Sequence, residues 1–404
     1  MNANMKAAIF KIFPFILCFV LSCSIHAQEI IMKEVGQTLP GASQTEAYLS
    51  LIQNKTVGVV ANQTSLIGTT HLVDSLLNLG IKVQCIFTPE HGFRGEADAG
   101  AHIIGGKDSR TGINIISLYG NHKKPSKEDL SQLEVLLFDL QDVGVRFYTY
   151  ISTLTYVMEA CSEQNIPVIV LDRPNPNGFY IDGPVLEKAH QSFVGMHQVP
   201  IVYGMTIGEY ARMVNCEKWL TNQLNCDLTV IPLRHYDRNA IDKLTVRPSP
   251  NLPNYQAIFL YPSLCLFEGT SVSIGRGTDF PFQVYGHPNL PETNFSFIPE
   301  SRAGASAPKH HDTKCNGFDL RTLADQPEMK YAKLNLQWLM QAYQSVKQDK
   351  FFNSYFEKLA GTSELRRQIE GGKSEEDIRK SWQNGIEEFR KIRAKYLLYP
   401  DFEE

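Results

Sequence analysis

The sequence lacks the features of an integral membrane protein, a nucleic-acid-binding protein or a zinc protein. Among its 404 residues, no apolar run after the amino-terminal leader approaches the roughly 20 residues of a membrane-spanning helix. Acidic residues outnumber basic residues, 43 to 39, and no basic run occurs, so nucleic acid is not the predicted partner. The eight cysteines are scattered and form no C-x-x-C pair, which disfavours a zinc site. A hydrophobic content of 43% is typical of an ordinary folded protein.

The motifs of several common enzyme classes are also missing. Gly106-Lys107 is followed by Asp108 and lacks the earlier glycine of a phosphate-binding loop, and Gly275-Arg276-Gly277 lacks the third glycine of a dinucleotide fingerprint. No G-x-S-x-G elbow follows a strand, and no H-E-x-x-H occurs. A serine hydrolase, a zincin and an ordinary NAD enzyme are therefore disfavoured. We predict that the protein needs no cofactor and no metal.

The first 27 residues are typical of a secretory signal peptide. Lys6 and Lys11 precede the apolar run Ile12–Leu21, and Ile25-His26-Ala27 forms a small-residue cleavage site. The mature protein is therefore predicted to be exported, either to the periplasm or out of the cell. As an alternative, Val20-Leu21-Ser22-Cys23 weakly resembles a lipoprotein cleavage box, in which Cys23 would carry a lipid anchor.

The cysteines of the mature chain fall into two groups. Cys85, Cys161 and Cys265 lie in apolar runs and are predicted to be small core residues. Cys216 and Cys226 flank a polar loop and are candidates for a disulfide in an oxidising compartment. The sequence does not decide whether they pair.

Short apolar runs alternate with helical stretches through residues 28–253. The runs are nearly continuous in Val, Ile and Leu, as in parallel strands buried on both faces. The expected strands are Thr56–Ala61, Val83–Thr88, Ile113–Leu118, Val135–Asp139, Val168–Asp172 and Leu228–Pro232. The expected helices are Thr70–Leu79, Ser126–Leu133, Ile151–Gln164 and Thr206–Asn215. This order predicts an α/β fold, a Rossmann-like doubly wound and mostly parallel sheet.

A proline-rich segment separates this part from the rest. Pro248-Ser249-Pro250-Asn251-Leu252-Pro253 has three prolines in six residues and is predicted to be a linker. The polar stretch Ser301–Thr313 and two amphipathic helices, Leu334–Lys347 and Glu375–Lys395, follow it. Residues 254–404 are therefore predicted to form a smaller α+β auxiliary domain.

Polar clusters follow the carboxyl ends of the predicted strands, where open α/β sheets bind their ligands. Acids, arginines, amides and tyrosines at one sheet edge suit a polyhydroxylated ligand, because carboxylates bind hydroxyls and arginines bind carboxylates. The candidate binding residues are Arg94, Asp139, Gln141, Asp142, Arg146, Tyr148, Tyr150, Asp172, Arg173, Asn175, Asn177, Glu268 and Arg276. Each also has a purely structural interpretation: helix caps for the acids, neutralisation for the arginines, turn formation for the asparagines and core packing for the tyrosines.

Glu90 is the strongest candidate for a catalytic group. It lies between Pro89 and His91 in a glycine-flanked loop after an apolar strand, with no helical face to solvate it. His91 is a candidate partner that orients Glu90. An apolar rim that includes Phe93 is expected to enclose the acid.

The clusters resemble those of the bacterial exo-β-N-acetylmuramidases, the NamZ-like enzymes. The similar runs are Thr88–Gly100, Leu137–Thr153, Leu171–Gly178, Gly204–Tyr210, Pro248–Pro253 and Phe267–Pro281. The resemblance implies a Rossmann-like domain and an auxiliary domain with a cleft between them. It implies release of N-acetylmuramic acid from the non-reducing ends of peptidoglycan fragments, so that muramic-acid-containing disaccharides are expected partners. The proposed catalytic glutamate of the family corresponds to Glu90.

Glycoside hydrolysis explains why these residue types are needed. An acid must protonate the leaving oxygen, and a second carboxylate or the acetamide of the substrate must stabilise the positive charge at the sugar. Glu90 is the expected acid, and Asp139, Asp142 and Glu268 are equal candidates for the second role. Arg146, Arg173 or Arg276 is expected to bind the lactyl carboxylate of muramic acid.

Two other functions fit parts of the pattern. A periplasmic carbohydrate-binding protein would share the export signal and the polar cleft, and it would need no enclosed acid. A metal-dependent hydrolase would combine Glu90, His91, Asp139 and Asp142. The sequence leaves the stereochemical course and the oligomeric state open.

Overall fold

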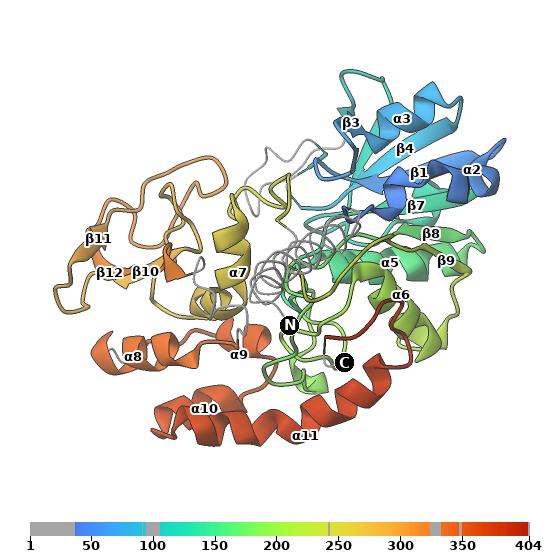
Figure 1. Ribbon diagram of the computed structural model, residues 1–404. Coiled ribbons are helices and arrows are strands. Elements are labelled where there is room, and N and C mark those ends of the chain that lie inside the picture. The colour runs from blue at the N-terminus through green and yellow to red at the C-terminus, as the bar shows by residue number, and fades with distance from the viewer. Residues whose placement is uncertain are drawn as a thin grey trace, which may run out of the picture.

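The computed structural model describes residues 37–90, 92–93, 106–240, 243–323, 333–346 and 350–402. Two lobes lie side by side in Figure 1: the first lobe comprises the described residues up to 253, and the second lobe comprises those from 254 onward. None of the described helices is both long and apolar enough to cross a membrane. The predicted signal peptide, with Cys18 and Cys23, lies outside the described residues.

A seven-stranded sheet forms the centre of the first lobe. Its order is β5-β6-β4-β1-β7-β8-β9, and every pairing is parallel except that of β5 with β6 at one edge. The strands are β1 (Thr56–Ala61), β4 (Lys82–Thr88), β5 (Gly106–Lys107), β6 (Asn114–Ser117), β7 (Val135–Asp139), β8 (Val168–Leu171) and β9 (Leu228–Ile231). The chain winds from β1 toward β4 and β6 and then from β7 toward β8 and β9, so the direction reverses between β1 and β7. A doubly wound sheet binds its ligands near such a reversal.

Helices cover both faces of this sheet (Figure 1). The first lobe contains α2 (Thr45–Ile52), α3 (Leu72–Asn78), α4 (Lys127–Leu130), α5 (Tyr150–Glu163) and α6 (Ile207–Cys216). The position of β7 in the sheet explains why its sequence is uniformly apolar. Val135 and Leu137 join the core formed with α2 and α3, whereas Leu136 and Phe138 join the core formed with α5 and α6. Because both faces of β7 are buried, its sequence does not alternate between polar and apolar residues.

The second lobe combines helices with a small antiparallel sheet of order β10-β12-β11. The strands are β10 (Val284–His287), β11 (Phe295–Phe297) and β12 (Cys315–Asp319). The helices are α7 (Tyr255–Leu264), the short 3-10 helix η4 (Cys265–Gly269), α8 (Leu336–Val346), α9 (Phe356–Ala360), α10 (Glu364–Glu370) and α11 (Glu375–Arg393). The combination of helices and an antiparallel sheet confirms the prediction that the smaller second part has an α+β fold.

The elements expected from the sequence are present, with differences at their ends: Thr70–His71, predicted as helix, is the short strand β3, and α4 covers only Lys127–Leu130 of the predicted Ser126–Leu133. All six predicted strands and all four predicted helices of the first lobe form, as do the two predicted helices of the second lobe. The sequence did not predict helices α2, α7, α9 and α10, the edge strand β5, the short pair of β2 (Leu66–Ile67) and β3, or the strands of the antiparallel sheet of the second lobe. The cysteines Cys85, Cys161 and Cys265 are buried as expected, and Cys216 and Cys226 are free thiols.

The proline-rich segment is a buried crossover rather than an open linker. The carbonyl oxygen of Pro248 accepts hydrogen bonds from Tyr148 Oη at 2.9 Å and Tyr150 Oη at 3.4 Å. The next residue, Asn254, accepts a hydrogen bond from Ala257 N through its side chain and so caps α7. The large apolar core continues from the first lobe into the second without interruption. The division into domains at 253 stays a prediction.

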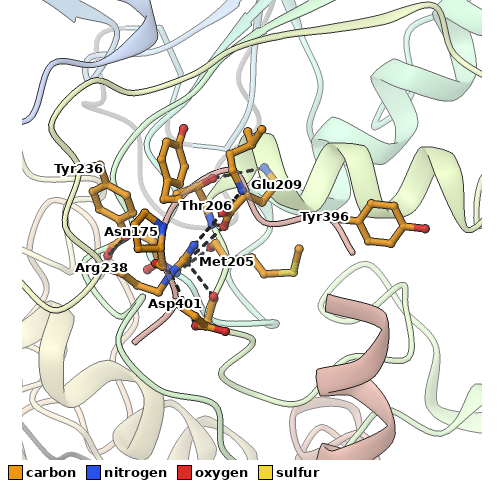
Figure 2. Close-up of polar contacts among 12 residues, drawn as sticks. Asn175, Met205, Thr206, Glu209, Tyr236, Arg238, Tyr396 and Asp401 are labelled. Atoms are coloured by element: carbon orange, nitrogen blue, oxygen red, sulfur yellow. Dashed lines mark hydrogen bonds and ion pairs between the residues drawn. The ribbon is translucent and has the colours of Figure 1, made fainter. Parts of the chain in front are cut away.

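The carboxyl-terminal segment, residues 394–402, returns from α11 to the first lobe. Figure 2 shows Glu209 and Asp401 converging on Arg238. The Arg238–Glu209 ion pair is fully buried with a distance of 2.7 Å. Arg393, the last residue of α11, donates to the carbonyl oxygen of Gly204 and pairs with Asp401 at 2.6 Å. The end of the chain therefore fastens the second lobe to the sheet of the first.

Candidate active site

A cleft of about 490 Å³ lies between the two lobes. The first lobe contributes residues that follow β4, β6 and β7, at the carboxyl edge of the sheet, together with a loop after His190 and the proline-rich segment. The lining residues that carry charge are Glu90, Lys123, Glu268, Arg276 and Lys358, and the aromatic ones are Tyr119, Phe147, Tyr148, Tyr150, Phe193, Tyr261, Phe282 and Tyr355. Two carboxylates, three cations and many aromatic faces can bind a sugar that carries a negative charge.

Glu90 reaches the cleft because β4 ends at Thr88 and Pro89 stops the strand from continuing. Its side chain is half-buried and lies near two phenols. Burial raises the pKa of Tyr150 and of Tyr355, and the negative charge of Glu90 raises the pKa of both further. Both phenols therefore stay protonated at neutral pH and remain hydrogen-bond donors beside the carboxylate.

Glu268 and Arg276 contribute the second carboxylate and a cation from the second lobe. Glu268 lies in η4, and Arg276 Nη1 lies 3.3 Å from Glu268 Oε1. Their side chains are 21% and 27% exposed, so a ligand in the cleft can reach both. Arg276 Nη2 also donates to the carbonyl oxygen of Gly304 at 3.2 Å, and Asn251 donates to the same oxygen at 2.8 Å. The proline-rich segment and Arg276 are thus held in one network.

A half-buried lysine holds the backbone that carries Glu268. Lys309 Nζ donates to the carbonyl oxygens of Phe267 at 2.8 Å, Glu268 at 3.1 Å and Thr270 at 2.7 Å. Burial lowers the pKa of Lys309, and the charge of Glu268 acts in the opposite direction. An ammonium group that binds several carbonyls fixes this turn of backbone in place. Nothing in the polar stretch around Lys309 distinguishes this lysine in the sequence.

Asp139 and Arg173 do not reach the cleft, because they pair with each other inside the first lobe. Arg173 Nε lies 2.5 Å from Asp139 Oδ1, and Arg173 Nη2 lies 2.8 Å from Oδ2. Asp139 is fully buried and Arg173 is nearly so. This two-point contact satisfies both groups, so neither the second carboxylate nor the lactyl-binding arginine expected in the sequence is brought to the cleft from this pair.

Asp142 and Asp172 are likewise enclosed. Burial raises the pKa of Asp142 to about 6, and its carboxylate accepts hydrogen bonds from Gly144 N and Tyr203 Oη. Burial raises the pKa of Asp172 to about 7, and this carboxylate accepts a hydrogen bond at 2.5 Å from Tyr399 of the carboxyl-terminal segment. Neither lines the cleft.

Arg146 is fully buried and donates to backbone carbonyls of both lobes. The acceptors are Pro184 at 2.8 Å, Val199 at 2.7 Å, Leu359 at 3.0 Å and Ala360 at 2.7 Å. Burial lowers the pKa of Arg146 to about 9. Four backbone partners occupy the two terminal nitrogens, so Arg146 joins the lobes instead of facing the cleft. Of the three arginines expected to bind the lactyl group, Arg276 lines the cleft, and Arg146 and Arg173 do not.

The three candidate amides also serve the scaffold. Gln141 Nε2 donates to the carbonyl oxygens of Asp142 and Pro174. Asn175 Nδ2 donates to Met205 O at 2.8 Å, a contact drawn in Figure 2. Asn177 Nδ2 donates to Val143 O at 2.8 Å and to Ile258 O, in α7, at 3.3 Å. Their turn-forming interpretation therefore fits the structure, and none of them lines the cleft.

Three further predictions concern the loop of Glu90. His91 and Arg94 lie outside the described residues. Phe93 does not form an apolar rim of the cleft: it is buried against His71, with ring centroids 4.7 Å apart. The proposed metal set is not assembled, because Asp139 is paired with Arg173, and no group of three His, Cys, Asp or Glu suited to a metal occurs within the described ranges.

Sequence reasoning missed several residues of the cleft. Tyr119 and Lys123 follow β6, Phe193 lies at a turn, and Tyr355 and Lys358 belong to the α9 region. Lys123 Nζ lies 4.7 Å from the ring centroid of Phe193, a cation–π contact at the rim. Tyr119 and Lys123 stand after a predicted strand, which was a usable signal. The α9 residues carried none, because their position depends on how the second lobe packs.

Comparison with known proteins agrees with this architecture. Two family models match the chain in succession: the N-terminal model of the exo-β-N-acetylmuramidase NamZ over residues 57–256, and the C-terminal model over residues 259–399. The chain belongs to the NamZ family. It is 39% identical over 374 residues to the peptidoglycan β-N-acetylmuramidase NamZ of Bacillus subtilis, with 87% of this chain and 89% of that protein covered.

Solved structures of two DUF1343 family proteins from Bacteroides fragilis have the same fold. One is 46% identical to this NamZ family member, with a TM-score of 0.85 over 91% of this chain and 100% of the other. The second is 27% identical, with a TM-score of 0.76 over 90% of this chain and 99% of the other. The α/β fold with a smaller second part is therefore shared by the family.

Proposed function

We propose that this protein is an exo-acting glycoside hydrolase that releases N-acetylmuramic acid from the non-reducing ends of peptidoglycan fragments. Membership of the NamZ family supports the glycoside hydrolase class and the substrate class. The observation that carries the residue assignment is the cleft, in which Glu90 of one lobe and Glu268 of the other line the same space beside Arg276. Most glycosidases use two carboxyl groups in one cleft for catalysis.

In this proposal Glu90 is the general acid. It transfers its proton to the glycosidic oxygen while the bond from that oxygen to the anomeric carbon breaks, and a water molecule supplies the hydroxyl group that replaces it. The proton lost by the water passes to a carboxylate, and where this is not Glu90 itself, exchange with solvent restores the starting protonation of both groups. Glu268 is the carboxylate available in the cleft to stabilise the positive charge at the sugar or to accept that proton.

Arg276 is the proposed contact of the lactyl carboxylate. Its guanidinium is partly exposed in the cleft and held by Glu268 and Gly304, so its position is set before a ligand binds. A pre-positioned guanidinium offers a two-point hydrogen bond to a carboxylate. N-acetylglucosamine lacks the lactyl group, so its β-glycosides are expected to be poor substrates.

The direct test is incubation of the purified protein with a chromogenic β-N-acetylmuraminide. We expect release of the chromophore, and we expect much slower release from the matching β-N-acetylglucosaminide. Binding of muramic-acid-containing disaccharides without any release would show instead that the protein is a carbohydrate-binding protein. Equal turnover of the two glycosides would contradict the role of Arg276.

We also propose that the protein acts in the periplasm or outside the cell after removal of residues 1–27. The support is the basic and apolar composition of this leader and the cleavage site before Gln28. Amino-terminal sequencing of the mature protein tests the proposal. A mature chain that starts at a lipidated Cys23 would show membrane anchoring, and a chain that retains its leader would contradict export.

A further inference from the structure

We propose that a second cavity beside the cleft binds a further sugar ring of the glycan, on the reducing-end side of the bond that is cleaved. This proposal rests on the proposed function. The second cavity has a volume of about 650 Å³ and lies in the first lobe. It shares two residues with the cleft, Ser192 and Phe193, so the two spaces are separated by one turn of the chain.

The dividing turn has a defined structure. The backbone amide of Ser192 donates to Gly195 O at 2.9 Å, and the amide of Gly195 donates to Ser192 O at 3.0 Å. These two bonds make a tight hairpin with Phe193 and Val194 at its tip. Phe193 stacks on Tyr156 with ring centroids 5.9 Å apart and an angle of 16° between the rings. The wall between the cavities is therefore a supported aromatic surface.

The lining of the second cavity suits a neutral, hydroxylated ring. Tyr156, Phe193 and Trp219 are each only partly buried and present aromatic surface, and Trp219 stacks on His197 with ring centroids 5.4 Å apart. Gln191 and Gln198 add exposed amides. Aromatic faces combined with a few polar groups bind ligands that have an apolar face and a hydroxylated rim.

The charged groups at this cavity are already neutralised within the protein. The Glu159 carboxylate accepts a hydrogen bond from Thr221 N at 2.8 Å and pairs with Lys124 at 3.2 Å. Burial lowers the pKa of His197 to about 4, so its ring is neutral at physiological pH. Only Lys188, exposed at the edge, adds a cation. This balance favours an uncharged sugar ring over an ionic ligand.

The direction of the glycan follows from the exo mode of action. When the terminal sugar is the one released, no sugar lies beyond it on the non-reducing side. Any further ring of the same chain must therefore bind on the reducing-end side. A sugar-binding cavity beside the cleft would therefore hold a ring on the reducing-end side of the cleaved bond.

The test compares a short and a long substrate. The chromogenic β-N-acetylmuraminide occupies the cleft alone, whereas a tetrasaccharide of alternating N-acetylmuramic acid and N-acetylglucosamine extends beyond it. For Trp219→Ala we expect kcat/KM on the tetrasaccharide to fall about tenfold, mainly through KM, because a stacked ring contact is lost. We expect kcat/KM on the short substrate to stay within about twofold of wild type.

Two further variants keep the test decisive. Gln198→Ala changes an exposed side chain of the same cavity and is expected to show the same substrate-dependent loss, even where Trp219→Ala fails to fold. Phe318→Ala, in β12, removes a 40% exposed aromatic ring that lines neither cavity and serves as the matched control. Thermal unfolding of each variant reports its folded state.

The outcomes separate the alternatives. Equal losses on both substrates, or no loss on either, would overturn the sugar-binding assignment. A loss that appears only with substrates bearing stem peptides would show that the cavity binds peptide, which also overturns it. If the wild type does not cleave the short substrate, the proposed function is wrong. The proposal for the cavity is then tested by measuring the binding of the tetrasaccharide.

Binding can be measured without turnover by tryptophan fluorescence. The chain has three tryptophans, and of these only Trp219 lines either of the described cavities. In a Glu90→Gln background, the tetrasaccharide is expected to change the emission of Trp219. The change should disappear in the double variant with Trp219→Phe and persist with Trp338→Phe. A signal that survives Trp219→Phe would overturn the proposal.

Discussion

Two groups of charged side chains lie near the same sheet edge and have opposite surroundings. The inner group, including the pairs Asp139–Arg173 and Glu209–Arg238, is buried and satisfied by protein partners. The cleft group, Glu90, Glu268 and Arg276, is partly exposed and opens into the space between the lobes. The comparison shows that residue type alone does not mark a binding site. What distinguishes the cleft group is access to a ligand, and what distinguishes the inner group is complete pairing.

The largest effect should follow from Glu90→Gln. Removal of a general acid costs about 10²- to 10⁴-fold in rate, and the amide keeps the shape of the side chain. We expect a loss of this size in kcat on a peptidoglycan disaccharide, measured by the release of N-acetylmuramic acid. The melting temperature should not change. Glu292→Gln, at an exposed position outside the cleft, is the control, and full activity in Glu90→Gln would refute the assignment.

For the inner group, Arg238→Met should act on stability instead. It leaves Glu209 buried without its cation, which costs about 3–5 kcal/mol when a buried ion pair is broken. Denaturant unfolding measures this free energy. The exposed pair Lys380–Glu376 provides the control, because Lys380→Met removes a contact that solvent already screens. If Arg238→Met changed kcat of the folded protein but not its stability, the division into two groups would be wrong.

Arg276→Met should change substrate preference within the cleft group. Loss of a hydrogen-bonded contact to a carboxylate costs about 1.5–3 kcal/mol, or roughly 10- to 100-fold in kcat/KM. The loss is expected on the muraminide and not on the glucosaminide, which has no lactyl group. Arg302→Met changes a more exposed arginine of the same lobe that does not line the cleft, and should alter neither rate. Equal losses of kcat/KM on both substrates would show that Arg276 positions Glu268 and does not bind the lactyl carboxylate.

A last prediction concerns the pH dependence of stability. The pKa of Asp172 is about 7 in the folded protein, above its ordinary value of 3.8, so the folded state binds more protons than the unfolded state between these pH values. Stability contributed by this group is therefore greatest below pH 4 and falls as the pH rises to 7. The free energy of unfolding of wild type, relative to Asp172→Asn, should decrease by about 3 kcal/mol over this interval. A constant difference across the interval would contradict the raised pKa.

The fold of the first lobe could be predicted because each strand carries its own signal. Val135–Asp139 is apolar throughout, since both of its faces are buried. The small antiparallel sheet gave no such signal, because its strands are short and β12 includes Asn316 and Gly317. Helix α9, with Lys358, depends on contacts far away in the sequence.

The site was predicted in part for a related reason. Loops after strands point to the correct sheet edge, and Glu90, Tyr148, Tyr150, Glu268 and Arg276 do line the cleft. The same rule also selected Asp172, because the edge that receives a ligand is also where the carboxyl-terminal segment docks. A single sequence does not show which of its own residues will cover a polar group, so buried and accessible acids look alike.

The docking of that segment has a consequence for the order in which the protein is made. Asp172 and Glu209 are synthesised well before their partners: Tyr399, which contacts Asp172, lies 227 residues later, and the amide of Leu398, which donates to Glu209, lies 189 residues later. During translation, Asp172 and Glu209 therefore lack the contacts that residues 398 and 399 later supply. These contacts form only after Leu398 and Tyr399 have been synthesised, so a chain that stops before them would leave both acids of the first lobe without these partners.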